Sequence, residues 1–141
     1  MRGKAFIDTN VLVYLQSATD AGKRDVSRRA IDALDCVCST QVLSELANVL
    51  VRKAKIPHDR VGEIIDGTVQ ACDLAVVTHA TVQNALRIAK ENVLGVYDSL
   101  IVASALESGC EYLVSEDLTD GQRIEGKLTI VNVYAHPEFF D

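Results

Sequence analysis

Short apolar runs alternate with longer helical patterns along the chain, and this alternation restricts the possible folds more than any other feature of the sequence. Five runs predict strands, at Ala5–Asp8, Cys36–Ser39, Leu74–Val77, Tyr112–Ser115 and Leu128–Val133. Between them, helical patterns cover about Asn10–Gln16, Gly22–Leu34, Thr40–Ala54, Pro57–Cys72, Thr78–Lys90 and Asp98–Glu107. Thr40 and Thr78 are the expected N-caps of their helices. Strands that are separated by helices pair in parallel through right-handed crossovers. The sequence therefore predicts an α/β fold, a three-layer α/β/α sandwich with a central, mostly parallel sheet.

Length and composition fit one domain. With 141 residues, 48 % of them hydrophobic, the chain can bury roughly two-thirds of its unfolded surface. We therefore expect a single domain over residues 1–141. No segment approaches the ~18 unbroken apolar residues of a membrane span, and a strand-like run follows Met1–Lys4 without a signal-peptide pattern. These features predict a cytoplasmic protein with no membrane partner.

The cysteine pattern is also consistent with a cytoplasmic protein. Cys36 and Cys38 are two residues apart in an apolar run, so both side chains point to one face of a strand. With Cys72 and Cys110 they form neither a CxxC pair nor a zinc-type Cys/His spacing. We expect four buried, reduced thiols.

The formal net charge of −6 argues against nucleic-acid binding through a general positive field. It does not exclude an enzyme that acts on nucleic acid, because metal-binding carboxylates count in this sum and bound cations offset them. Basic residues cluster within 23–29 and within 52–60. Solvated helix surfaces explain both clusters equally well.

Acidic residues stand at four positions where solvated carboxylates are not normally placed: Asp8, Glu45, Asp98 and Asp117. Asp8 ends the first apolar run, and Asp117 follows the run Tyr112–Val114. Ligands of open parallel sheets bind beyond the carboxyl ends of the strands. Both residues are therefore expected at the edge of the sheet where a site would form.

Glu45 and Asp98 fall on apolar helix faces. Glu45 shares a face with Val42 and Leu46, where an unpaired carboxylate would cost several kcal/mol in lost hydration. Asp98 stands three residues before Ile101, at the start of the inward face of its helix. For Glu45 the structural alternatives are a buried salt bridge or a side chain that reaches to solvent from the edge of the apolar stripe. For Asp98 they are an N-cap or a first-turn position favoured by the helix dipole.

Carboxylates that converge on one interior spot repel each other unless a cation joins them. Mg²⁺ and Mn²⁺, hard ions that prefer oxygen ligands, are the natural candidates. Such ions activate water and stabilise the charge that develops in phosphodiester hydrolysis, so a metal-dependent hydrolase is consistent with this set of residues.

Four segments of the chain resemble the ordered signature of PIN domains, and most closely the toxins of VapBC toxin–antitoxin pairs: Phe6–Leu12, Ser44–Glu45, Tyr97–Ala103 and Leu113–Leu118. The resemblance implies a PIN-like fold in which Asp8, Glu45, Asp98 and Asp117 are the catalytic, metal-binding acids. It places Asn10 and Ser115 in supporting positions. The implied activity is an endoribonuclease that needs Mg²⁺ or Mn²⁺ and leaves a 5′-phosphate. The implied partners are an RNA substrate, a VapB-like antitoxin and a second copy of the chain in a homodimer.

Several alternatives remain at this level. Glu116 and Asp120 flank Asp117 and are alternative fourth ligands. A catalytically silent PIN-like binding protein is one alternative function. Another Mg²⁺-dependent α/β phosphohydrolase is a second, although the haloacid-dehalogenase type needs an aspartate two residues after the first, where this chain has Asn10.

The expected antitoxin would insert a basic residue into the acidic site and cover apolar helix surfaces between Gln41 and Cys72. Val61, Ile64 and Ile65 are candidates for this contact and for a homodimer surface, and core packing is the alternative use for Ile64 and Ile65.

Overall fold

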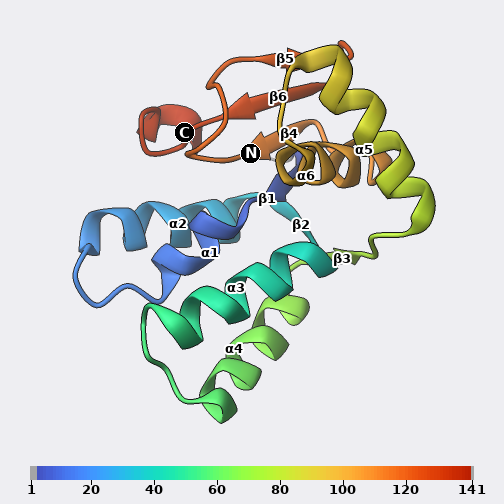
Figure 1. The fold of residues 1–141 in the computed structure, drawn as a ribbon. Helices are drawn as coiled ribbons and strands as arrows, with labels where there is room; N and C mark the ends of the chain where they lie inside the picture. The colour runs from blue at the N-terminus through green and yellow to red at the C-terminus, as the bar shows by residue number, and fades with distance from the viewer. Residues whose placement is uncertain (1–2, 141) are drawn as a thin grey trace.

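The computed structural model describes residues 3–140, so the expected domain limits, residues 1 and 141, lie outside the described residues. Six strands form one sheet in the order β3-β2-β1-β4-β6-β5 (Figure 1). Their bounds are β1 Lys4–Ile7, β2 Asp35–Ser39, β3 Asp73–Ala75, β4 Tyr112–Val114, β5 Arg123–Ile124 and β6 Leu128–Val131. Every ladder is parallel except the pair β5 and β6. The predicted central, mostly parallel sheet is confirmed.

Six α-helices cover the sheet: α1 Thr9–Leu15, α2 Ala21–Ala33, α3 Thr40–Arg52, α4 His58–Ala71, α5 His79–Asn92 and α6 Val96–Glu107. A short 3₁₀ helix, η1, spans Pro137–Phe140. The chain moves from β1 to β3 in one direction and then returns to β4, so right-handed crossovers place α1–α4 on one face and α5–α6 on the other. Figure 1 shows these two groups apart, which confirms the three-layer sandwich. Within residues 3–140, no helix combines the length and apolar character needed to cross a membrane.

The central strands supply the core. Phe6 and Ile7 of β1, Leu113 of β4 and Ile130 of β6 have no exposed surface. Strands that are covered by helices on both faces need continuous apolar runs, which is why these segments do not alternate with polar residues. The four cysteines are free and buried, as expected from the sequence.

The ends of some elements differ from the sequence-based expectation. Ser39, not Thr40, caps α3, because its hydroxyl accepts a hydrogen bond from the Val42 N–H (3.3 Å). The Thr40 hydroxyl instead accepts from the N–H of Val77 (3.1 Å), which lies beyond the end of β3. Thr78 caps α5 as expected, in a reciprocal capping box with Thr81.

The expectation also missed β5, which has only two residues and therefore no detectable periodicity. It pairs with β6 through a turn in which Glu125 and Gly126 both have positive φ, +54° and +65°. This backbone is characteristic of type I′ hairpin turns. The sheet therefore ends in an antiparallel strand that the helix-and-strand alternation did not predict.

Leu113→Ala should lower the free energy of unfolding by about 2–5 kcal/mol, because Leu113 is enclosed in the central strand β4 and its removal leaves a cavity. Leu86→Ala is the matched control. Leu86 is 49 % exposed on α5, so its truncation should change stability by less than about 1 kcal/mol. Urea unfolding of the two variants measures both values, and equal losses would contradict the assigned packing.

Candidate active site

The order of the strands places a crevice beside β1. In the sheet, β2 and β3 lie on one side of β1, and the later strands β4, β6 and β5 lie on the other side. In open α/β sheets, ligands bind beyond the carboxyl ends of the strands at such a reversal. Asp8 directly follows β1, and Ser115 directly follows the neighbouring strand β4. The two residues that flank the reversal are therefore the natural starting point of a site.

Asp8 is held by hydrogen bonds from both strand ends. The Ser115 hydroxyl donates to its Oδ2 (2.7 Å), and the backbone N–H of Thr9 donates to its Oδ1 (2.7 Å). Only 9 % of Asp8 is exposed. Burial raises the pKa of Asp8, the two hydrogen bonds oppose that rise, and the charges of Asp117 and Asp98 add to it.

Glu45 approaches the same place from α3. It lies on the inward side of the helix beside the buried Leu46, and it is half-buried. The Thr9 hydroxyl donates to its Oε1 (3.1 Å). Burial is the main cause that raises the pKa of Glu45, and the charges of Asp8 and Asp98 raise it further. Across residues 3–140 no cationic side chain pairs with Glu45, so the alternative of a buried salt bridge is wrong for the part of the chain that is described.

Asp98 and Asp117 complete the acidic cluster from more exposed positions. The sequence places Asp98 at the start of its helix, but α6 begins at Val96 and Gly95 is the N-cap, without a side-chain cap. The N-cap alternative for Asp98 is therefore wrong, whereas the alternative of an aspartate in the first turn of the helix is confirmed. Asp117 lies in the loop after β4, where its N–H donates to the Ser115 hydroxyl (3.2 Å).

The four carboxylates are close enough to influence one another, but their side chains are not drawn together. Asp98 acts on the pKa of both Asp8 and Glu45, and Asp117 acts on that of Asp8. No three Asp, Glu, His or Cys side chains among residues 3–140 are already placed to hold a metal ion. The backbone thus gathers the acids around one crevice, and a shared ion would require their side chains to turn inward.

The two other acids of the last motif are engaged elsewhere. Glu116 forms an ion pair with Lys23 and accepts a hydrogen bond from the Tyr14 hydroxyl (2.6 Å). Asp120 accepts from the backbone N–H of Asn132 (2.8 Å) and contacts a ring nitrogen of His136 (2.6 Å). Of the three acids in this segment, Asp117 is the one whose charge contributes to the raised pKa of Asp8.

Lys23 anchors the loop that carries Asp117. Its ammonium group lies over the rings of Tyr14 and Tyr134, at 4.7 and 5.4 Å from the ring centres, while it pairs with Glu116. The Tyr134 hydroxyl is hydrogen-bonded to Ser27 of α2 (2.7 Å). This contact network ties α1, α2 and the chain beyond β6 to the loop after β4. Sequence reasoning did not find it, because its members are separated by up to 107 residues.

Some buried polar atoms without partners belong to residues near the acids in the sequence. Within residues 3–140 these atoms belong to the Asn10 amide, the Ser99 hydroxyl and the carbonyl oxygen of the Gln41 side chain. Asn10 follows Asp8 by two residues, Ser99 adjoins Asp98, and Gln41 lies one helical turn before Glu45. Buried groups of this kind usually have a partner. Oxygen-rich surroundings with unsatisfied polar atoms and repelling carboxylates fit a hydrated Mg²⁺ or Mn²⁺ ion.

The sequence was compared with family models and curated proteins. The model of the PIN domain matches residues 5–119, and the chain therefore belongs to the PIN domain family. This assignment excludes the alternative of a phosphohydrolase of another α/β family. A comparison with curated proteins finds no match.

Solved structures with the same fold include several toxin–antitoxin proteins. A toxin–antitoxin complex from Klebsiella pneumoniae is 19 % identical, with a TM-score of 0.69, and the match covers 91 % of this chain and 96 % of that one. VapBC2 from Rickettsia felis, bound to a promoter DNA fragment, is 17 % identical (TM-score 0.65, coverage 90 % and 96 %). VapC20 from Mycobacterium tuberculosis, a toxin that cleaves the sarcin–ricin loop, is 19 % identical (TM-score 0.65, coverage 80 % and 89 %). At these identities the similarity establishes the fold.

Asp98→Asn should leave the free energy of unfolding of the metal-free protein unchanged or raise it. Any gain in stability should be larger at neutral than at acidic pH. Removing this charge lowers the raised pKa values of Asp8 and Glu45. A carboxyl group whose pKa is raised on folding destabilises the fold as pH rises through that pKa, so the benefit grows with pH. Urea unfolding in chelator at pH 5 and pH 7.5 measures the difference. Asp66→Asn, an exposed position on α4, is the control. A marked loss of stability specific to Asp98→Asn would contradict the proximity of the acids.

Proposed function

We propose that the chain is a metal-dependent endoribonuclease of the VapC type, the toxin of a cytoplasmic type II toxin–antitoxin pair. The observation that supports this most strongly is the carboxylate of Asp8, 9 % exposed at the strand reversal, whose pKa is raised by burial and by two neighbouring acids. A protein keeps mutually repelling carboxylates at a crevice when a cation compensates them in the working state.

Asp8, Glu45, Asp98 and Asp117 would hold one or two Mg²⁺ or Mn²⁺ ions. When bound, such ions lower the pKa of water and neutralise charge on the phosphodiester. The chain's own contribution is orientation. Ser115 fixes one oxygen of Asp8 and Thr9 links Asp8 to Glu45, through the hydrogen bonds described above. Asn10, two residues after Asp8, has a buried amide without a partner, and we assign it the supporting role expected from the sequence.

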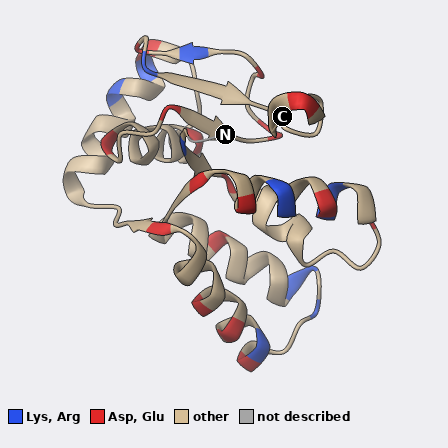
Figure 2. Cartoon of the chain, turned by 180° about the vertical axis from the view of Figure 1, so that it is seen from behind, with Lys and Arg blue, Asp and Glu red and all other residues tan. Residues whose placement is uncertain are grey.

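Charge distribution supports substrate binding at the acidic site and not over a broad basic surface. In the view of Figure 2, Lys and Arg positions are interspersed with Asp and Glu positions. With a net charge of −6, the protein repels RNA at long range. Bound divalent ions would reverse the local charge at the crevice, so metal and RNA binding should depend on each other.

Asp8→Asn should abolish cleavage of mixed RNA, because it removes a direct ligand. Ser115→Ala should lower the rate by about 10- to 100-fold, because it removes only the hydrogen bond that orients that ligand. Asp66→Asn on the exposed side of α4 should cleave as the parent does. The measurement is the cleavage rate with and without Mn²⁺, with analysis of the 5′ ends for phosphate. A metal-dependent parent activity that survives Asp8→Asn would refute the proposed site. An inactive, RNA-binding parent protein would favour the silent binding protein.

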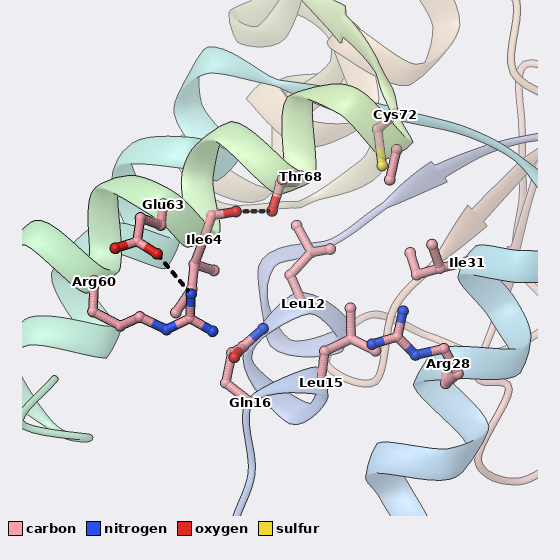
Figure 3. A pocket seen from close by; sticks show the side chains of 12 residues that line it. Leu12, Leu15, Gln16, Arg28, Ile31, Arg60, Glu63, Ile64, Thr68 and Cys72 are labelled. Carbon is pink, nitrogen blue, oxygen red and sulfur yellow. Dashed lines mark hydrogen bonds and ion pairs between the residues drawn. The ribbon is translucent and has the colours of Figure 1, made fainter.

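A groove between α1, α2 and α4 supports the proposed antitoxin partner (Figure 3). Its volume is about 290 Å³, and its lining combines the apolar Leu12, Leu15 and Ile31 with polar and charged side chains. Arg28 and Arg60 lie on opposite sides of it, and Arg60 pairs with Glu63 (3.2 Å). An amphipathic helix with acidic residues on its edges would fit this lining.

The contact surface differs in part from the one expected from the sequence. Val61 and Ile64 are 5 % and 8 % exposed and belong to the core, while Ile65 is half-buried. Ile64 also lines the groove. The groove therefore extends the expected surface on α4 towards α1 and α2. For the proposed homodimer, α5 offers the better surface, because Val82 and Leu86 are 39 % and 49 % exposed.

Gly67→Phe should prevent antitoxin binding by filling the groove. Gly67 lines the groove on α4, and a Cβ there would meet no atom within 4 Å, so the larger side chain is accommodated by the fold. Gly62→Phe is the matched control. Gly62 lies on the same helix with equally open space, but it does not line the groove. Co-purification with the product of the adjacent small open reading frame measures binding. Equal retention of the partner by both variants would contradict this groove as the contact.

A further inference from the structure

A second cavity opens beside the acidic site, at the N-terminal end of α3. Its volume is about 540 Å³, within the range of small-ligand sites. The described residues that line it are Thr40, Gln41, Ser44, Glu45, Val77 and Tyr97. Glu45 belongs to both the cavity and the acidic cluster, and Tyr97 directly precedes Asp98. A group bound in this cavity would therefore lie next to the place where a phosphodiester is cut.

The first turn of α3 holds two parts of the cavity wall in place. The Thr40 hydroxyl accepts a hydrogen bond from the Val77 N–H (3.1 Å). The Gln41 side chain donates from Nε2 to the carbonyl oxygen of Tyr97 (3.2 Å). These bonds connect α3 to the segment after β3 and to the start of α6. The cavity is thus preformed, which lowers the entropic cost of binding.

The lining favours an uncharged, flat ligand. Tyr97 is 72 % exposed, an unusual position for an aromatic ring, and Val77 adds apolar surface. None of the described lining residues is basic, and Glu45 is acidic, so the cavity disfavours a phosphate group. The Gln41 nitrogen must face the Tyr97 carbonyl, which leaves its Oε1 as an acceptor without a partner. The Oε1 atom is buried, so the ligand should be recognised through the π-face that it offers to Tyr97.

We propose that this cavity binds a nucleobase of the RNA substrate, from one of the two nucleotides that flank the cleaved bond. The base stacks on the Tyr97 ring, which Gln41 holds in place through its hydrogen bond to the Tyr97 carbonyl. The assignment rests on the proposed ribonuclease function and adds a residue that selects and positions the substrate. Exposed Val76 and Val96, 62 % and 46 % accessible, make a second copy of the chain the competing occupant.

The test uses an oligoribonucleotide that spans a cleavage site mapped in mixed RNA. Its affinity is measured for Asp8→Asn protein, which retains the cavity, and for the same protein with Tyr97→Ala or Tyr97→Phe. Tyr97→Ala should weaken binding by roughly five-fold to hundred-fold, and Tyr97→Phe should restore it because the ring still stacks. An oligonucleotide that is abasic at one flanking position should bind Asp8→Asn protein more weakly by a similar factor. The abasic change should have little further effect in the Tyr97→Ala protein. Val93→Ala is the control, because Val93 is 91 % exposed at the end of α5 and does not line the cavity.

The outcomes separate the two proposals. If the parent protein neither cleaves nor binds RNA, the proposed function is refuted and the base site with it. If the parent cleaves RNA but Tyr97→Ala binds as tightly as the control, the base site alone is refuted. Light scattering gives the oligomeric state of the same samples. If binding falls only because Tyr97→Ala converts a dimer to a monomer, the cavity is an interface between copies and the base site is refuted.

Discussion

Mutual repulsion among carboxylates at the end of β1 is the interaction on which the site depends. Asp8 is fixed in a buried position by hydrogen bonds from Ser115 and from the backbone of Thr9. Glu45 is directed to the same crevice by the Thr9 hydroxyl. The fold thus holds acids near one another at a cost to the stability of the metal-free protein, which a bound cation would offset. The surrounding helices are the framework that makes this arrangement possible.

The parts of the fold with long, periodic patterns could be predicted from the sequence. The apolar runs around Phe6 and Leu113 define buried parallel strands, and the inward stripe of Val42 and Leu46 defines α3. The hairpin strand β5 could not be predicted, because two residues carry no period and the turn is set by backbone angles at Glu125 and Gly126. Local capping was the other weak point, since Ser39 and Thr40 are chemically equivalent caps.

The candidate site shows a similar division. The positions of Asp8 and Glu45 followed from strand ends and helix faces. The choice among Asp117, Glu116 and Asp120 did not follow from such patterns. It depends on contacts with residues outside this segment, because Glu116 pairs with Lys23 and Asp120 contacts His136. The same holds for the cavity at Tyr97, which forms only when α3 and the start of α6 are brought together.

Diffraction from crystals soaked in Mn²⁺, collected at the manganese absorption edge, tests the central claim most directly. We expect an anomalous peak in the crevice at the end of β1, with oxygen atoms of Asp8 and at least two of Glu45, Asp98 and Asp117 at roughly 2–2.6 Å from an ion or its neighbour. The side chains should turn inward from the positions described above. A manganese peak elsewhere, or carboxylates that stay apart at saturating Mn²⁺, would contradict a metal site built from these four acids.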